Sequence, residues 1–259
     1  MKRVLLLCAI ALAWSTTATA NDIAFYVGAP NTDGWYTVAA MTADVETIIA
    51  LAGHQFKDVK TFDDTQFDDF AAWVEANTND GEMDIIWLNG CMPSVLYQFP
   101  NVNPDGSRAE EWLNGGNMFI NVGDWFAYCS YEGGARKPDN GGTGAANILN
   151  LSSGIIVGGA QGVMAVTELG RQYLPSLNPV AAERPIQFSA VVAPWEIAAV
   201  FGQNAAGTHG DPVVIHNTET GGYVAFINQA VTWIDDRGLT CAEFINNWVA
   251  TVIGLTDKS

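Results

Sequence analysis

The sequence predicts an α/β fold, a three-layer sandwich in which a mostly parallel central sheet lies between two layers of helices. Three observations support this prediction. Short apolar segments alternate with segments of helical periodicity along the first half of the chain. These apolar segments lack the polar alternation of half-exposed strands, which is typical of strands covered on both faces. A β-hairpin and an amphipathic helix are then expected near the C-terminus.

Four strands and three helices are expected in the first half. The strands are expected at residues 23–27, 56–62, 83–88 and 117–122. Apolar residues recur every three or four positions over residues 38–52, which predicts the first helix, and Gly53 ends it. The second helix is expected to follow an N-cap at Asp64 or Thr65, and the third to begin at Ser107.

The second half is less regular and contains a loop rich in Gly, Asn and Asp at 133–144. Further strands are expected at 188–192, 197–201, 212–216 and 223–227, the last two as a hairpin. Thr240 is expected to cap the final helix. Because no internal repeat or linker interrupts the chain, residues 21–259 are expected to form a single domain.

Residues 1–20 have the order of a secretory signal peptide. Basic residues precede the apolar stretch 4–14, and Ala18-Thr19-Ala20 supplies the cleavage motif. The apolar stretch is about half the ~20 residues that a membrane-spanning helix needs. We therefore expect cleavage after Ala20 and a secreted or periplasmic protein.

The chain is strongly acidic, with 28 Asp and Glu residues against 11 Lys and Arg residues and a net charge of −17. Such a surface repels phosphate backbones, so no nucleic-acid partner is expected. No membrane span is expected once the signal is cleaved. The acidity fits either solubility in salty surroundings or the binding of calcium or another cation. The sequence contains no nucleotide-binding loop motif, and no cofactor is expected.

Two patterns bear on a metal site. The three histidines lack the spacing of metal ligands: His54, His209 and His216. Residues 101–107 imitate the start of a calcium loop, but the twelfth position, which requires a bidentate carboxylate, is Trp112. The simpler interpretation is a turn into a helix, with Ser107 and Glu110 as a capping box. No metal site is expected.

Three cysteines remain after signal cleavage: Cys91, Cys129 and Cys241. Cys91 follows the third strand and Cys129 lies just beyond the fourth, so both are expected near the same edge of the sheet. In an exported protein these two can form a disulfide. The alternative is a reactive thiol at Cys91. Cys241, beside the start of the final helix, is expected to be a buried thiol.

Three segments carry a resemblance to a known family: Trp87-Leu-Asn-Gly90, the stretch from Glu111 to Trp125, and the late hairpin. Together with the order of the elements, they resemble the class I glutamine amidotransferase-like superfamily. Within this superfamily the chain resembles the trehalose-utilisation (ThuA-like) branch, and the resemblance implies a flavodoxin-like sheet over nearly the whole mature chain. Catalytic members carry a cysteine at the turn after the fourth strand and a later His-x-Glu pair. Here that turn reads Val122-Gly-Asp-Trp125, and the His-x-Glu pair is absent at His216. Glutamine hydrolysis is therefore not expected.

Ligands of open parallel sheets bind outside the carboxyl ends of the strands. The residues expected to line this edge are Asp33, Asn89, Gly90, Gly123, Asp124, Trp125 and Tyr128. Asp124 either presents its carboxylate to a pocket or caps the following turn through backbone N–H groups. Likewise Trp125, Phe126 and Tyr128 form either an aromatic wall, as at sugar sites, or part of the core.

Three functional hypotheses follow. The first is an exported, non-catalytic module that binds a small ligand, a glycan or a partner protein at this edge. The second is an exported hydrolase or lyase acting on a carbohydrate-like substrate, with Asp124 as the acid or base and Asp33 or Glu132 as its partner. The third is a structural protein of a surface assembly.

Overall fold

The computed structural model describes residues 21–28, 35–98, 106–127, 129–132, 135–136, 142–152, 154–156, 158–159, 161–230 and 236–254. The signal segment, Asp33, Tyr128 and the first five residues of the calcium-like loop lie outside these residues. For Cys129 and Glu132 the backbone alone is described.

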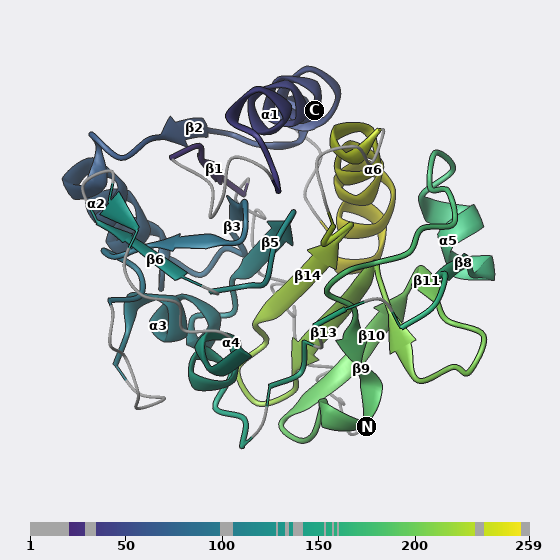
Figure 1. Ribbon diagram of the computed structural model, residues 1–259. Helices are drawn as coiled ribbons and strands as arrows, with labels where there is room; N and C mark the ends of the chain where they lie inside the picture. The colour runs from purple at the N-terminus through teal and green to yellow at the C-terminus, as the bar shows by residue number, and fades with distance from the viewer. Residues whose placement is uncertain are drawn as a thin grey trace, which may run out of the picture.

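The protein is a mixed α/β structure built on a seven-stranded sheet with the strand order β10-β13-β14-β5-β3-β1-β2 (Figure 1). The parallel strands are β1 (Ile23–Tyr26), β2 (Val59–Phe62), β3 (Ile85–Leu88), β5 (Met118–Val122) and β14 (Tyr223–Ile227). The strands β13 (Val213–Asn217) and β10 (Trp195–Val200) continue the sheet in antiparallel fashion. The predicted α/β class, the mostly parallel sheet and the late hairpin are therefore confirmed.

Helices cover both faces of the sheet (Figure 1). One face carries α1 (Val38–Ala52), α6 (Arg237–Glu243) and the π-helix η3 (Phe244–Ile253). The other carries α2 (Phe67–Asn77), α3 (Arg108–Asn114) and α4 (Gly142–Ile148). Successive strand residues alternate between the two cores: Phe25 and Trp87 pack with α1, whereas Tyr26 and Leu88 pack with α2.

Smaller elements surround the sheet. A four-stranded sheet contains β8 (Ala165–Val166), β11 (Gly202–Gln203), β12 (His209–Gly210) and β9 (Ile186–Gln187), and a three-stranded sheet contains β4 (Cys91–Pro93), β6 (Cys129–Glu132) and β7 (Ala135–Arg136). The remaining helical segments are η1 (Gly53–Gln55), α5 (Glu168–Tyr173) and η2 (Phe188–Ala190).

Several local predictions are wrong. The expected strand at 188–192 is instead a 3₁₀ turn, η2. Neither Asp64 nor Thr65 caps α2, which follows Gln66. The Thr65 hydroxyl donates to Asp63 and the Asp64 carboxylate accepts from the hydroxyl of Tyr26 instead. Thr240 lies inside α6 rather than at its cap. The capping box of Ser107 and Glu110 is confirmed at the start of α3.

Polar side chains at the amino ends of the parallel strands connect neighbouring strands. Asp22 Oδ1 accepts a hydrogen bond from the N–H of Asp58 (2.9 Å), and Asp84 Oδ1 accepts one from the N–H of Asp22 (2.6 Å). Asn117 Oδ1 accepts the N–H of Asp84 (2.8 Å). Each of these four residues directly precedes its strand. We call Asp22, Asp84 and Asn117 the amino-edge ladder.

Replacement of Asn117 by Ala should destabilise the protein strongly. Asn117 is fully buried, and its amide also donates to the carbonyl of Thr78 (3.1 Å). The change leaves buried backbone groups without partners, so the free energy of unfolding should fall by about 2 to 4 kcal/mol in urea denaturation. Exposed Asn178, which also donates to one carbonyl, is the matched control, and Asn178→Ala should change stability by about 0.5 kcal/mol or less. Equal effects of the two changes would contradict the role of the ladder.

Candidate functional site

The turns after β3 and β5 meet at the carboxyl edge of the sheet. Gly90 and Gly123 both have positive φ angles, of 92° and 78°. A Cβ on Gly90 would lie 2.6 Å from the Cβ of Asp124, and a Cβ on Gly123 would lie 2.7 Å from the ring of Tyr36. Glycine is therefore required at both turns, by conformation and by space. The structure brings Gly90, Gly123 and Asp124 together, as the sequence predicts.

Asn89 lies beneath this surface. It is fully buried, and its amide donates to the carbonyl of Gly28 and accepts from the N–H of Cys91, both at 3.1 Å. The side chain thus connects the turn after β3 to the residues that follow β1. A ligand contact by Asn89 remains a prediction.

Asp124 is 3% exposed and has a cationic neighbour. Its Oδ1 accepts a hydrogen bond from the N–H of Trp125 (2.8 Å) and lies 3.4 Å from Nε of Arg184. The carboxylate therefore holds a backbone N–H of the following turn, which is one of the two roles weighed for it. Its presentation to a pocket remains a prediction. The partner carboxylates considered for an enzyme, Asp33 and the side chain of Glu132, lie outside the described residues.

Arg184 is a site residue that the sequence did not reveal. Its guanidinium carbon lies over the rings of Trp35, at 4.3 Å, and Trp125, at 4.6 Å, measured to each ring centroid. The indole N–H of Trp35 donates to the carbonyl of Gly123 (2.9 Å), which fixes this ring to the turn after β5. Stacking of a guanidinium on aromatic faces is favourable when the contact is shielded from water. Arg184 lies in an irregular segment, so no local pattern marked it.

Trp125 and its neighbour Phe126 have different surroundings. Trp125 is half-buried beside Arg184, whereas Phe126 is fully buried and packs against Phe119 and Phe226. Of the two alternatives weighed for these aromatic residues, the core position is therefore correct for Phe126, whereas Trp125 packs against the same core and also contacts Arg184. Trp35, which the sequence did not single out, supplies the second ring.

A second layer of buried polar groups supports the site. Asn121 donates to Gln229 Oε1 (3.0 Å) and to the carbonyl of Asp124 (2.8 Å). Gln229 in turn donates to the carbonyl of Arg184 (2.8 Å). Both Asn121 and Gln229 are fully buried. This chain of contacts links the ends of β5 and β14 to the segment that carries Arg184.

Asp211 holds the turn after β14 in place. Its two carboxylate oxygens accept the N–H groups of Asn228 (2.7 Å) and Gln229 (2.8 Å). Complete burial raises the pKa of Asp211 to about 7, although these hydrogen bonds and the charge of Arg237 oppose the shift. Asn228 has a φ of 47°, a conformation that costs energy in a non-glycine residue and persists where the surroundings impose it.

A buried ionic cluster joins α1 and α6 to the underside of the site. Arg237 is 1% exposed; its Nη1 lies 3.7 Å from Asp44 Oδ2, and its guanidinium lies 4.6 Å from the centroid of the Tyr36 ring. The Tyr36 hydroxyl donates to the same carboxylate oxygen (2.6 Å). Burial, and then the charge of Asp44, raises the pKa of Tyr36 well above its usual value. Since Tyr36 packs under Gly123, this cluster supports the turn that carries Asp124.

Cys91 and Cys129 are register partners in the parallel pair formed by β4 and β6. Neighbouring strands lie about 4.8 Å apart, a spacing within the Cα range of disulfides. The predicted disulfide between them remains a prediction. Cys241 is fully buried, and burial raises its pKa, so the expectation of a buried thiol is confirmed.

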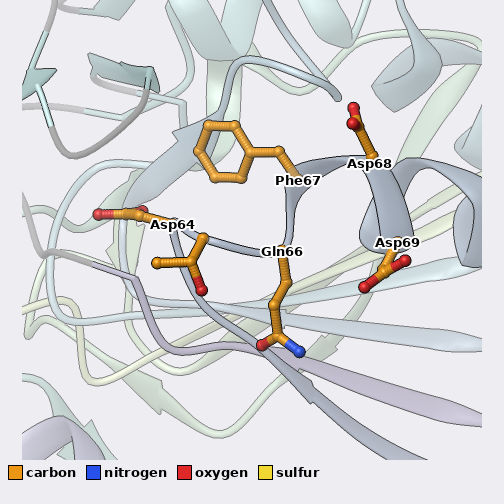
Figure 2. A pocket seen from close by; sticks show the side chains of 6 residues that line it. Asp64, Gln66, Phe67, Asp68 and Asp69 are labelled. Atoms are coloured by element: carbon orange, nitrogen blue, oxygen red, sulfur yellow. The ribbon is translucent and has the colours of Figure 1, made fainter.

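An acidic hollow of about 320 Å³ lies where β2 leads into α2 (Figure 2). Its lining residues are Asp64, Thr65, Gln66, Phe67, Asp68 and Asp69. Asp64 accepts a hydrogen bond from the hydroxyl of Tyr26, and Figure 2 shows that the three carboxylates do not converge on one point. Within the described residues, no group of three or more His, Cys, Asp or Glu side chains could hold a metal ion.

The stability of the protein should fall as the pH rises from about 4 to 7. Burial raises the pKa of both Asp211 and Asp84 to about 7. In this range the folded state holds protons that the unfolded state has released, and each such proton contributes a slope of about 1.4 kcal/mol per pH unit. Asp211→Asn should reduce the slope, measured by urea denaturation at several pH values.

Removal of a negative charge also reduces general repulsion, so this experiment needs a charge control. Asp68→Asn, at an exposed position of α2, removes one negative charge without altering a buried carboxyl. If both variants change the slope equally, the buried carboxyl of Asp211 is not the cause of the fall in stability with rising pH.

The described part of the chain contains no helix that is long and apolar enough to cross a membrane. No protein-family model matches the chain, and no curated protein does so either. The function is therefore inferred from the residues of the site itself.

Proposed function

We propose that the protein is an exported, non-catalytic α/β module that binds a small polar ligand of the glycan type at the carboxyl edge of its sheet. One observation carries this proposal. The turn after β5 presents Asp124 paired with Arg184, and the guanidinium lies over the half-buried rings of Trp35 and Trp125. Aromatic rings beside planar hydrogen-bonding groups are the usual components of a small-molecule site.

The burial and the contacts of Asp124 favour a binding role over a catalytic one. A general acid or base must come within hydrogen-bond distance of the proton that it transfers. Asp124 is 3% exposed, and its Oδ1 is engaged by the N–H of Trp125 and by Arg184. The same turn holds neither a cysteine nor a serine, so the nucleophile of the family that the sequence resembles is not replaced by another.

The strand order supports the proposed family of folds. Counted along the chain, the parallel strands β2-β1-β3-β5-β14 have the order 2-1-3-4-5, which is that of flavodoxin-like sheets. This order is consistent with a glutamine amidotransferase-like domain of the ThuA-like branch. In such sheets ligands bind at the carboxyl edge, where Asp124 and Arg184 lie.

The proposed export is compatible with the start of the fold. Asn21, the first residue after the proposed cleavage site, donates its side-chain amide to the carbonyl of Met83. Asp22 belongs to the amino-edge ladder. Cleavage after Ala20 would leave both contacts intact.

The proposed binding should be visible as thermal stabilisation. A ligand at about 100 times its Kd stabilises the native state by about 2.7 kcal/mol, which raises the Tm of a chain of this size by roughly 5 to 10 °C. We expect such a shift with at least one member of a panel of neutral sugars, sugar acids and amino acids. Trp125→Ala should abolish it.

Trp73→Ala is the matched control, because Trp73 is also half-buried but packs against Trp112 under α2 and α3. It should lower the Tm of the unliganded protein and retain the shift. No shift with any panel member, or a shift that survives Trp125→Ala, would refute the proposed site.

Export and the predicted disulfide can be tested on the secreted protein. Its intact mass should correspond to a chain that begins at Asn21 and lacks two hydrogens, because Cys91 and Cys129 are joined. Reduction should restore these two hydrogens, and peptide mapping without reduction should recover the two cysteines in one linked pair. A retained signal segment would contradict export by cleavage, and separate Cys91 and Cys129 peptides would contradict the disulfide.

A further inference from the structure

Arg184 retains hydrogen-bond donors that the protein does not use. Nη1 donates to the carbonyl of Glu183 (3.0 Å), and Nε faces Asp124. Among the described residues, none accepts a hydrogen bond from Nη2. The side chain is 19% exposed, so part of the guanidinium is accessible from outside.

The surroundings fix the direction of these donors. The guanidinium lies over Trp35 and Trp125, so its faces are used by the rings, and its N–H edge is left for a ligand. Trp35 is held by Gly123, and the backbone of Arg184 is held by Gln229. A donor held in this way loses little conformational freedom when a ligand binds.

The geometry and charge of the site restrict the chemical class of ligand that can bind. A guanidinium edge matches the two oxygens of a carboxylate, which it binds through parallel hydrogen bonds. Asp124 stands beside Arg184, and the whole chain has a net charge of −17, so a dianion such as phosphate meets more repulsion than a monoanion. The two indoles favour an organic ligand with an apolar face over a small inorganic ion.

We propose that the N–H edge of Arg184 binds the carboxylate of a small organic acid, of which a uronic acid is the simplest glycan-type example. This inference rests on the proposed binding function and names the chemical class of the ligand. Trp35 and Trp125 position the guanidinium, and Asp124 limits the charge that the ligand can carry.

Calorimetric titration of the exported protein tests this inference. The ligands are D-glucuronate, its neutral counterpart D-glucose, N-acetylglycine as a carboxylate without a sugar, and inorganic phosphate. Glucuronate should bind at least about tenfold more tightly than glucose, and phosphate should bind weakest, because one charge-assisted bidentate contact contributes at least this factor.

Two arginine variants separate the site from general charge effects. Arg184→Met keeps an unbranched aliphatic side chain without the guanidinium and should weaken glucuronate binding at least about tenfold. Arg171→Met is the matched control: Arg171 is exposed, and its Nη1 also donates to a single backbone carbonyl, that of Val166 (2.7 Å). It should leave binding unchanged. If Arg184→Met fails to fold, Arg184→Lys keeps the charge without the planar edge and should also weaken binding.

The outcomes distinguish this inference from the proposed function. Glucose binding as tightly as glucuronate, or glucuronate binding unaffected at Arg184, overturns the carboxylate site and leaves the binding function in place. Binding of N-acetylglycine that depends on Arg184, without binding of glucuronate, supports the carboxylate site and assigns the acid to an amino acid rather than a sugar. Absence of binding by all four ligands overturns the carboxylate site, whereas the proposed binding function is overturned only if the wider thermal-shift panel also gives no shift.

Discussion

Buried polar side chains at both ends of short parallel strands are the constraint on which the rest of the structure depends. The parallel strands contain four or five residues each, so the backbone bonds between any two of them are few. At the amino edge, Asp22, Asp84 and Asn117 each accept the N–H that precedes the neighbouring strand. Because such a side chain reaches that N–H in a single register, the ladder reinforces the register that the apolar residues select.

Buried polar side chains also connect the strand ends at the carboxyl edge. There they position residues of the candidate site instead of reinforcing the strand register. Asp211 holds the N–H groups of Asn228 and Gln229, and Gln229 in turn holds Asn121 and the backbone of Arg184. The strained φ of Asn228 is maintained by these bonds. A single buried carboxylate thereby positions an arginine that comes from a different part of the chain.

Two arginines of this acidic protein have similar surroundings. Arg237 is paired with Asp44 and lies over Tyr36; Arg184 is paired with Asp124 and lies over two indoles. In both cases a carboxylate balances the charge and an aromatic face replaces water. They differ in exposure, because Arg237 is 1% exposed, whereas the side chain of Arg184 is 19% exposed at the edge where open sheets bind ligands.

Local patterns in the sequence were sufficient to predict the α/β class, the parallel strands and the turn at Gly123 and Asp124. Periodicity and glycine preference can be read from residues that are close together in the sequence. They failed at 188–192, where an apolar run forms a 3₁₀ turn, and at the caps of α2 and α6, where other contacts prevailed. Arg184 could not be found in this way, since Trp35, Trp125 and Gln229 are distant from it in the sequence and contact it only in the folded structure. The sequence alone therefore determined the order of the elements and the position of the edge. The tertiary structure decided which charge faces Asp124, because that choice depends on packing between distant segments.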